Sequence, residues 1–462
     1  KPGEMYHLMR NQCESHYFTN AWSSDYGKTW QMKTTQRTKD STSAGGSING
    51  EGNIVLVDRD NAGKVTRMAG LGPDFIGWSH DRFEYGSTHA YAAAADWAVM
   101  ADSYADDWER RLVCLAEAVD HMAFDALRHP EYAYAEPGES FSGKAFTGAI
   151  EGKQLERAEG LVRRGLADGL HFSEMERAFT EAALAHYNDF GHSLIYVQKT
   201  GELIACLGHE TEAWLLPALA RHLVYTSRED LIPEFSGYAG ALADVTSVTG
   251  PVSEPPGDPL DTDGLQSGGV QAALDWTREA LADHGVETVY ESLLQANARG
   301  QVFYDVGFQD AFDRPVNDSV GWLSFTHALT FSGAVAAQCR KLPHLWPAGL
   351  LQMACFVGRN QRFQDRELDP STWWVDDSGA FLAGIDERLL DHGQRDPIFS
   401  AHLVKTSVAI RRELETASEE TSRWLLAALN RFLNSPLKQK HVRRLAHQAI
   451  DLVARDFDTS VS

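Results

Sequence analysis

The chain has 462 residues, of which 43% are hydrophobic and 23% are charged, and its 42 basic and 65 acidic side chains give a net charge of −23. This balance is typical of a folded protein with several domains and excludes a disordered chain or a collagen-like fibre. No apolar run reaches the roughly 18 residues of a membrane-spanning helix. A strongly negative protein repels nucleic acids and anionic lipids. We therefore expect neither a nucleic acid nor a membrane among its partners.

The cysteines are odd in number and scattered, which makes a poor disulfide framework. They are Cys13, Cys114, Cys206, Cys339 and Cys355. We therefore expect reduced, mostly buried thiols in a cytoplasmic protein. The chain begins with Lys and shows no signal-peptide pattern, which indicates either a processed start or a fragment.

Residues 1–88 are rich in Gly, Ser, Thr, Asn and aromatic side chains. Short runs at 5–9, 17–22 and 53–58 predict strands, and Asn49-Gly50 is a typical hairpin turn. We expect a small β-rich region here, which is either an intact domain or incomplete.

Apolar residues recur at helical spacing from residue 89 onward, which predicts an all-helical domain over 89–462. The expected helices are 90–105, 108–126, 154–166, 172–187, 193–207, 212–225, 270–284, 288–298, 323–339, 349–358, 402–415, 421–434 and 440–457. The stretches 130–148 and 360–379 are expected to be irregular. A segment with four prolines, 246–269, either divides this domain into two halves or is a long surface excursion. The predicted fold is mainly α, an antiparallel multi-helix array.

Two short motifs in the N-terminal region are incomplete as functional signatures. Residues 23–30, Ser-Ser-Asp-Tyr-Gly-Lys-Thr-Trp, match the Asp box, or BNR repeat, of sialidase-like β-propellers. One box in 88 residues is too little for a propeller of at least about four blades, so we interpret it as a β-hairpin element. Cys13 and His16 have the spacing of half a Rieske motif, but no Cys-x-His half accompanies them.

A polar stripe interrupts one predicted apolar helix, because His192, Tyr196 and Lys199 follow at i, i+4 and i+7. The stripe lines a pocket, or it consists of a satisfied core histidine and a snorkelling lysine. His402 and Lys405 repeat the pairing at i, i+3.

Glu117 and His121 stand one helical turn apart, a spacing that suits either a metal or an ordinary helix hydrogen bond. Together with His192 and His327 they are our candidate ligands for a transition metal such as iron or zinc. The Glu-x-x-His pairs of ferritin-like sites are missing, and four separate core histidines would give the same sequence.

Residues 186–196, His-Tyr-Asn-Asp-Phe-Gly-His-Ser-Leu-Ile-Tyr, resemble the central motif of the questin-oxidase-like family. The helix starts His-Ala-Leu-Thr at 327–330 and His-Leu-Val-Lys at 402–405 add to this resemblance, which extends over about 89–457. It implies an all-helical oxidoreductase that inserts oxygen into an anthraquinone ring with NADPH, and it places His192, His327 and His402 in the pocket. Similar helical domains occur fused to Rieske modules, which implies an electron-transfer partner. The chain departs from the family after His192, where Tyr-Val-Gln-Lys replaces a more apolar, Gly-rich stretch.

The sequence thus predicts an oxygen-dependent oxidoreductase that acts on a small hydrophobic molecule, aromatic or polyketide-like, with NADPH or a transition metal as cofactor. The expected catalytic residues are His192, Lys199, His327 and His402. The expected substrate-binding residues are Tyr196, Lys405, Trp322 and Trp346. A histidine would be the general base, and the lysines would stabilise an oxyanion. Two alternatives stay open: a non-enzymatic helical scaffold or binding protein, and a carbohydrate-binding fragment of a larger Asp-box protein.

Overall fold

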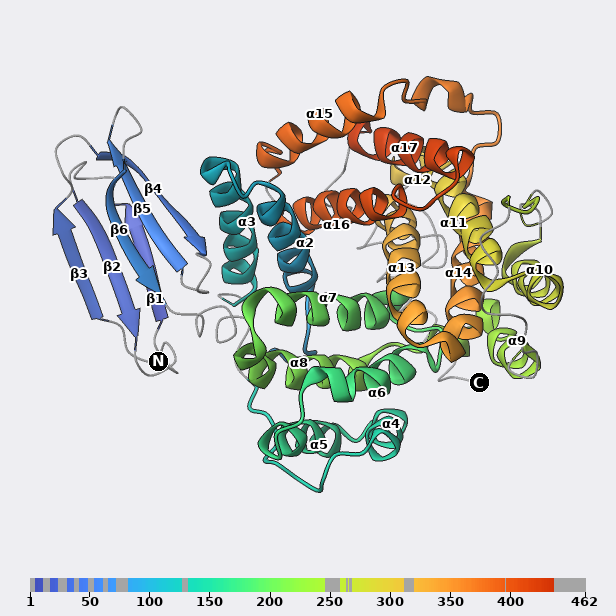
Figure 1. Cartoon of the computed structure of the whole chain (residues 1–462), viewed down its shortest axis with the longest axis horizontal. Helices are drawn as coiled ribbons and strands as arrows, with labels where there is room; N and C mark the ends of the chain where they lie inside the picture. Colours follow the sequence, from blue (N-terminus) through green and yellow to red (C-terminus); the bar gives the residue numbers. More distant parts are fainter. Residues whose placement is uncertain are drawn as a thin grey trace, which may run out of the picture. The chain divides into compact units, whose positions relative to one another are not determined.

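A computed structural model describes residues 82–126, 132–245, 258–262, 265, 268–310, 320–394 and 396–435, and it gives six N-terminal strands by their backbone (Figure 1). The first sheet joins β1 (Met5–Arg10), β2 (Tyr17–Ser23) and β3 (Gln31–Gln36), and the second joins β4 (Ser41–Ile48), β5 (Ile54–Asp60) and β6 (Val65–Leu71). Neighbouring strands within each sheet pair antiparallel. The runs predicted at 5–9, 17–22 and 53–58 coincide with β1, β2 and β5. The Asp box beyond Ser23 and the Cys13–His16 pair lie outside the described residues.

The prediction of a mainly α fold is confirmed, because helices make up most of the described residues. None of these helices is long and apolar enough to cross a membrane. The chain divides into two compact units: residues 1–182 with 196–225 form unit 1, and residues 183–195 with 226–462 form unit 2. The predicted dividing segment 246–269 falls largely outside the described residues.

The longer helices of unit 1 are α2 (His89–Ser103), α3 (Trp108–Ala126), α4 (Gly143–Glu151), α5 (Leu155–Ala167), most of α6 (Phe172–Leu184), most of α7 (His192–Leu207) and α8 (Glu212–Tyr225). Helix α2 packs on α3, and α4, α5 and α8 pack together. A buried ion pair fixes α8 to α5, because Arg221 Nε lies 2.5 Å from Glu159 Oε1 and each side chain is 2% exposed. The same guanidinium donates to the carbonyls of Phe83 and Tyr132, both at 3.0 Å, so the buried charge is fully hydrogen-bonded.

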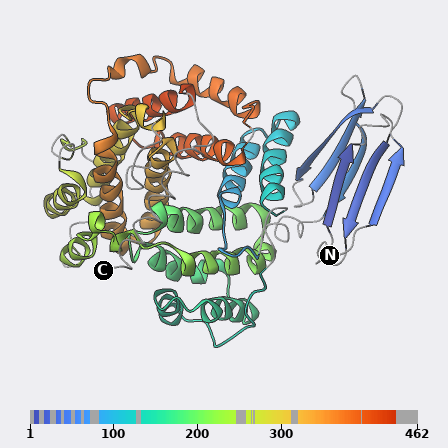
Figure 2. The same cartoon turned by 180° about the vertical axis from the view of Figure 1, so that it is seen from behind.

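The helices of unit 2 are α9 (Tyr238–Val245), α10 (Gly269–Asp283), α11 (Val286–Val302), α12 (Gly307–Asp310), α13 (Trp322–Lys341), α14 (Trp346–Asn360), α15 (Ser378–Leu390), α16 (Pro397–Glu413) and α17 (Glu419–Asn434), drawn from yellow-green to red in Figures 1 and 2. Short 3-10 turns are η1 (Asp189–Gly191), η3 (Glu229–Leu231), η4 (Pro233–Phe235), η7 (Pro343–Leu345), η8 (Gln361–Phe363) and η9 (Pro370–Trp373), while η2 (His209–Thr211) belongs to unit 1. Helix α13 packs against α11, α14 and α16. These contacts place α13 in the interior of unit 2.

Helices α4, α9, α12 and α15 are missing from the sequence prediction, and local caps begin α4 and α15 where Gly, Pro and Ser suggested irregular chain. Helix α4 starts inside the stretch expected to be irregular, and the Ser142 hydroxyl accepts a hydrogen bond from the Ala145 N–H at 3.2 Å. Helix α15 starts at Asp377, whose carboxylate accepts from the Ala380 N–H at 2.9 Å. Both are ordinary N-caps.

The described cysteines agree with the expectation of reduced thiols. Cys114, Cys339 and Cys355 are buried and Cys206 is exposed, and none of these four forms a disulfide bond in the described part of the chain. Cys13 lies outside the described residues.

Candidate functional site

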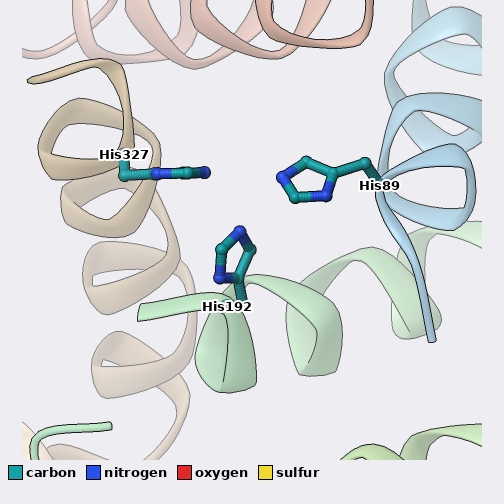
Figure 3. A group of neighbouring side chains, drawn as sticks. All are labelled: His89, His192 and His327. Atoms are coloured by element: carbon teal, nitrogen blue, oxygen red, sulfur yellow. The ribbon is translucent and has the colours of Figure 1, made fainter. Parts of the chain in front are cut away.

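Three of the predicted site residues come together in unit 2, and we call them the histidine cluster: His192 at the start of α7, His327 in α13 and His402 in α16. The ring centroids of His192 and His327 lie 4.4 Å apart, and those of His327 and His402 lie 4.9 Å apart. The Nε2 atoms of His327 and His402 are 3.1 Å from each other. Figure 3 shows His192 and His327; the third ring that it labels, His89, belongs to unit 1.

Backbone carbonyls fix the tautomer of two of these rings. The Nδ1 atom of His402 lies 2.6 Å from the Ile398 oxygen, and that of His192 lies 2.5 Å from the Asp189 oxygen. A carbonyl only accepts, so each Nδ1 carries the proton and each neutral ring keeps its lone pair on Nε2. Histidines that bind metals are held in the same way, through a hydrogen bond from the second ring nitrogen.

The 3.1 Å between the two Nε2 atoms also suits a shared metal ion. An ion about 2.0–2.1 Å from each nitrogen would make an N–metal–N angle of about 100°, which is close to tetrahedral or octahedral geometry. Without an ion, His327 donates its Nε2–H to His402. The arrangement therefore accommodates either a shared proton or a metal.

The cluster is largely withdrawn from water, since His402 is 0% and His327 is 7% exposed. Burial holds the pKa of His327 well below its ordinary value, and the charges of His192, His402 and Lys405 lower it further. Lys405 is itself buried on α16, three residues after His402. His327 is consequently a neutral imidazole near pH 7, which is the form that binds metals or accepts protons.

A strained turn at residues 189–191 positions His192 in the histidine cluster. Asp189, Phe190 and Gly191 have φ angles of 46°, 48° and 79°, and such values cost about 1–3 kcal/mol at each residue other than glycine. A Cβ atom on Gly191 would lie only 2.5 Å from Cδ2 of Phe331, one helical turn beyond His327 on α13. The bare backbone of Gly191 is what allows the chain to approach α13 so closely.

Hydrogen bonds from three sides hold this turn in place. The Ser193 hydroxyl donates to Asn188 Oδ1 at 2.7 Å, and the Asp189 N–H donates to the Ser227 oxygen at 3.2 Å. The Gln352 amide donates to the carbonyls of Leu184 and His186 at 3.1 and 2.9 Å. The sequence analysis did not identify these supporting residues, because Ser227 and Gln352 act through backbone atoms of distant segments and the contact of Ser193 with Asn188 depends on the strained turn between them.

The buried carboxyl group of Glu229 lies close to the same turn. The Ser227 hydroxyl contacts Glu229 Oε1 at 2.5 Å. Burial raises the pKa of Glu229 to about 7, and the charge of Asp189 raises it as well, against hydrogen bonds that lower it. Glu229 is therefore a group that titrates near neutrality beside the strained turn.

Lys199, a predicted catalytic residue, lies in a buried ion-pair network of unit 1. Its Nζ atom is 2.8 Å from Asp96 Oδ1 and 2.9 Å from Glu202 Oε2, and the Asp96 side chain is 0% exposed. Two carboxylates already surround the ammonium, so an oxyanion would have to compete with them. The sequence signal for this network was Asp96 itself, a lone acid within the Ala-rich stretch of α2.

The predicted substrate-binding aromatic residues pack against other protein rings. In unit 1, the buried Tyr196 ring lies 4.6 Å from that of His222. In unit 2, Trp322 lies 4.9 Å from Tyr304 between centroids, and Trp346 lies 5.6 Å from Tyr290. Both tryptophans are at most 2% exposed.

Glu117 and His121 lie one turn apart on α3 in unit 1. Among the described residues, they fall in no group of three His, Cys or carboxylate side chains whose ligand atoms lie within 4.8 Å of one another. A group that the sequence analysis missed does meet this criterion in unit 1: His171, His209 and Glu212. The signal that could have found it is the His-x-x-Glu spacing of the last two.

No known family model, curated protein or solved structure matches this chain. The resemblance to questin-oxidase-like proteins and to Asp-box repeats therefore stays a prediction.

Proposed function

We propose that the chain is an oxygen-dependent oxidoreductase whose histidine cluster binds one first-row transition-metal ion, with a hydrophobic aromatic or polyketide-like molecule as substrate. The observation that carries the proposal is the pair of Nε2 atoms of His327 and His402, 3.1 Å apart, with His192 against the same ring. Imidazole nitrogens suit iron, copper and zinc, and iron or copper supports oxygen chemistry.

The roles follow from the surroundings of each ring. His327 and His402 are the most buried, and they would hold the ion through Nε2. The His192 side chain is 13% exposed, so it is the member of the cluster that can meet a substrate or complete the metal coordination. Lys405 adds a positive charge beside His327, where it would stabilise an anionic intermediate.

The reaction that the resemblance implies is a mono-oxygenation. One atom of dioxygen enters a carbon–carbon bond of the substrate ring, and the other leaves as water. The two electrons come from NADPH, which becomes NADP⁺ as a hydride and one further proton are taken up. An electron-transfer partner would stand in the place of NADPH if electrons arrive one at a time.

The test compares the full chain, purified without a histidine tag, with the variants His402→Gln and His327→Gln. Elemental analysis should find that each variant loses one equivalent of iron, copper or zinc. Oxygen consumption with NADPH and an anthraquinone should fall at least about a hundredfold if a ligand of the reacting metal is removed. The exposed His284 gives the control His284→Ala, which should change neither quantity.

Far-UV circular dichroism and thermal unfolding establish that the variants are folded. Folded variants that keep the wild-type metal content and the wild-type oxygen consumption would refute the proposal. That result would favour the helical scaffold, in which the hydrogen bonds from His192 and His402 to backbone carbonyls are simply those of satisfied core histidines.

A further inference from the structure

A second histidine group lies in unit 1 and shares no residue with the histidine cluster. His171 directly precedes α6, His209 opens η2, and Glu212 is the first residue of α8. The sharp turn between α7 and η2 depends on Gly208, whose φ of 98° disfavours any other residue. This turn places His209 and Glu212 on one side of the chain, facing His171.

One carboxylate joins the two imidazoles. The Nδ1 atom of His171 lies 2.9 Å from Glu212 Oε2, and the Nδ1 atom of His209 lies 2.9 Å from Oε1. The ring centroids are 4.6 Å apart, and the ligand atoms of the three side chains all lie within 4.8 Å of one another. The ligand atoms of the three side chains are thus close enough together to bind a single ion.

The carboxylate is buried, whereas the imidazoles are open to solvent. The Glu212 side chain is 2% exposed, and those of His171 and His209 are 50% and 66% exposed. Oε1 of Glu212 also accepts the backbone N–H of Phe172 at 3.0 Å, which fixes the orientation of the carboxylate. An ion from solution can therefore reach a ligand that is already held in place.

From this geometry we infer that His171, His209 and Glu212 form a binding site for a divalent first-row transition metal such as Zn²⁺. Two imidazoles and one carboxylate are the ligand set of many zinc sites and of the facial triad of non-haem iron sites. Imidazole donors disfavour Mg²⁺ and Ca²⁺, which take oxygen ligands. Water would complete the coordination on the exposed side.

Metal binding here would tie the start of α6 to the start of α8. A metal on Nδ1 displaces the proton that each ring shares with the Glu212 carboxylate: a neutral ring carries this proton on Nε2 instead, and a protonated ring releases one proton. The inference stands independently of the proposed function, because its residues belong to unit 1 and share none with the histidine cluster.

The experiment is a calorimetric titration of the full chain with ZnCl₂ at pH 7.5, repeated with CoCl₂ to record its visible absorption. The titrations use a His402→Gln background, so that a metal in the histidine cluster does not contribute. We expect one equivalent of Zn²⁺ to bind, and His209→Ala, which changes an exposed side chain, should weaken binding at least about tenfold. Glu212→Gln should do the same, and the Co²⁺ bands should disappear in both variants.

Glu210→Gln is the matched control, since Glu210 is an exposed acid of the same η2 turn. It should bind Zn²⁺ with the affinity of the parent chain. The inference is overturned if the parent binds no Zn²⁺, or if His209→Ala binds it as tightly as the parent. Failure of the histidine cluster to bind metal would leave this result unchanged, so the two proposals can fail separately.

Discussion

His327 in unit 2 and His171 in unit 1 show how differently one residue type behaves in two settings. Burial holds the pKa of His327 well below its ordinary value, whereas the hydrogen bond that the ring of His171 donates to the Glu212 carboxylate raises the pKa of His171. The surroundings explain the difference, since burial disfavours the cationic ring of His327 and a neighbouring carboxylate favours the cationic ring of His171. Lys199 in unit 1 is likewise a cation held by carboxylates, since its ammonium group contacts both Asp96 and Glu202. Four substitutions test how burial and charged partners act in the two units.

Lys199→Met tests whether the stability of the chain depends on the ion pair between the buried Asp96 carboxylate and the Lys199 ammonium group. Removing the ammonium leaves Asp96 buried without its main counter-charge, and we expect unfolding to become easier by about 3–5 kcal/mol. Urea denaturation followed by circular dichroism measures this. Asp96→Asn in the same chain should restore most of the loss, and a stable single variant would instead leave Lys199 available for the predicted oxyanion role.

Gly191→Ala tests whether the close approach to α13 places His192. The new methyl group would lie 2.5 Å from the Phe331 ring, in a backbone region that disfavours alanine, so we expect a loss of about 2–4 kcal/mol. The control is Gly384→Ala in α15, where nothing lies within 4 Å and a helical alanine should stabilise by about 0.5–1 kcal/mol. Equal unfolding midpoints for the two variants would contradict the steric argument.

Glu229→Gln tests the buried carboxyl under the strained turn. Because its pKa is raised from 4.5 to about 7, ionising it opposes folding. The stability present below pH 4.5 is lost as pH rises to about 7, by at most about 3 kcal/mol. Glutamine cannot ionise, so the variant should exceed the wild type in stability at pH 8 and match it near pH 4. Denaturation curves at several pH values would show a constant difference if Glu229 does not titrate in this range.

His209→Ala without added metal should have the smallest effect, below about 1 kcal/mol, because the His209 side chain is 66% exposed and the Glu212 carboxylate keeps its hydrogen bonds with His171 and with the Phe172 N–H. Thermal unfolding in the presence of EDTA measures it. A clearly larger loss would mean that the imidazole supports the start of α8 by itself, and that its pairing with Glu212 is more than a surface contact.

The helices were the part of the fold that the sequence could predict best. The ranges 108–126 and 212–225 coincide with α3 and α8, because both are long runs of helix-forming residues with an acid in the first turn, Glu109 and Glu212. Helices α4 and α15 were missed, since single capping residues, Ser142 and Asp377, begin them in stretches with little apolar periodicity.

The candidate site was predictable only in part, for a similar reason. His192, His327 and His402 were chosen together from a resemblance and from their places near helix starts, but the 3.1 Å contact and the tautomers depend on packing. Nothing local connects His171 with Glu212, 41 residues later. A tertiary contact between single residues on different helices leaves no periodic trace in a sequence.

The close contact between Gly191 and Phe331 also limits which substitutions this protein can accept during evolution. As long as position 331 carries a large ring, position 191 accepts no side chain, so a single substitution at 191 would be eliminated by selection. The route to change runs through 331 first, because a smaller residue there would make room for a later methyl group at 191. Relatives that carry a side chain at 191 should therefore carry a smaller residue at 331, whereas a smaller residue at 331 can occur with glycine still at 191.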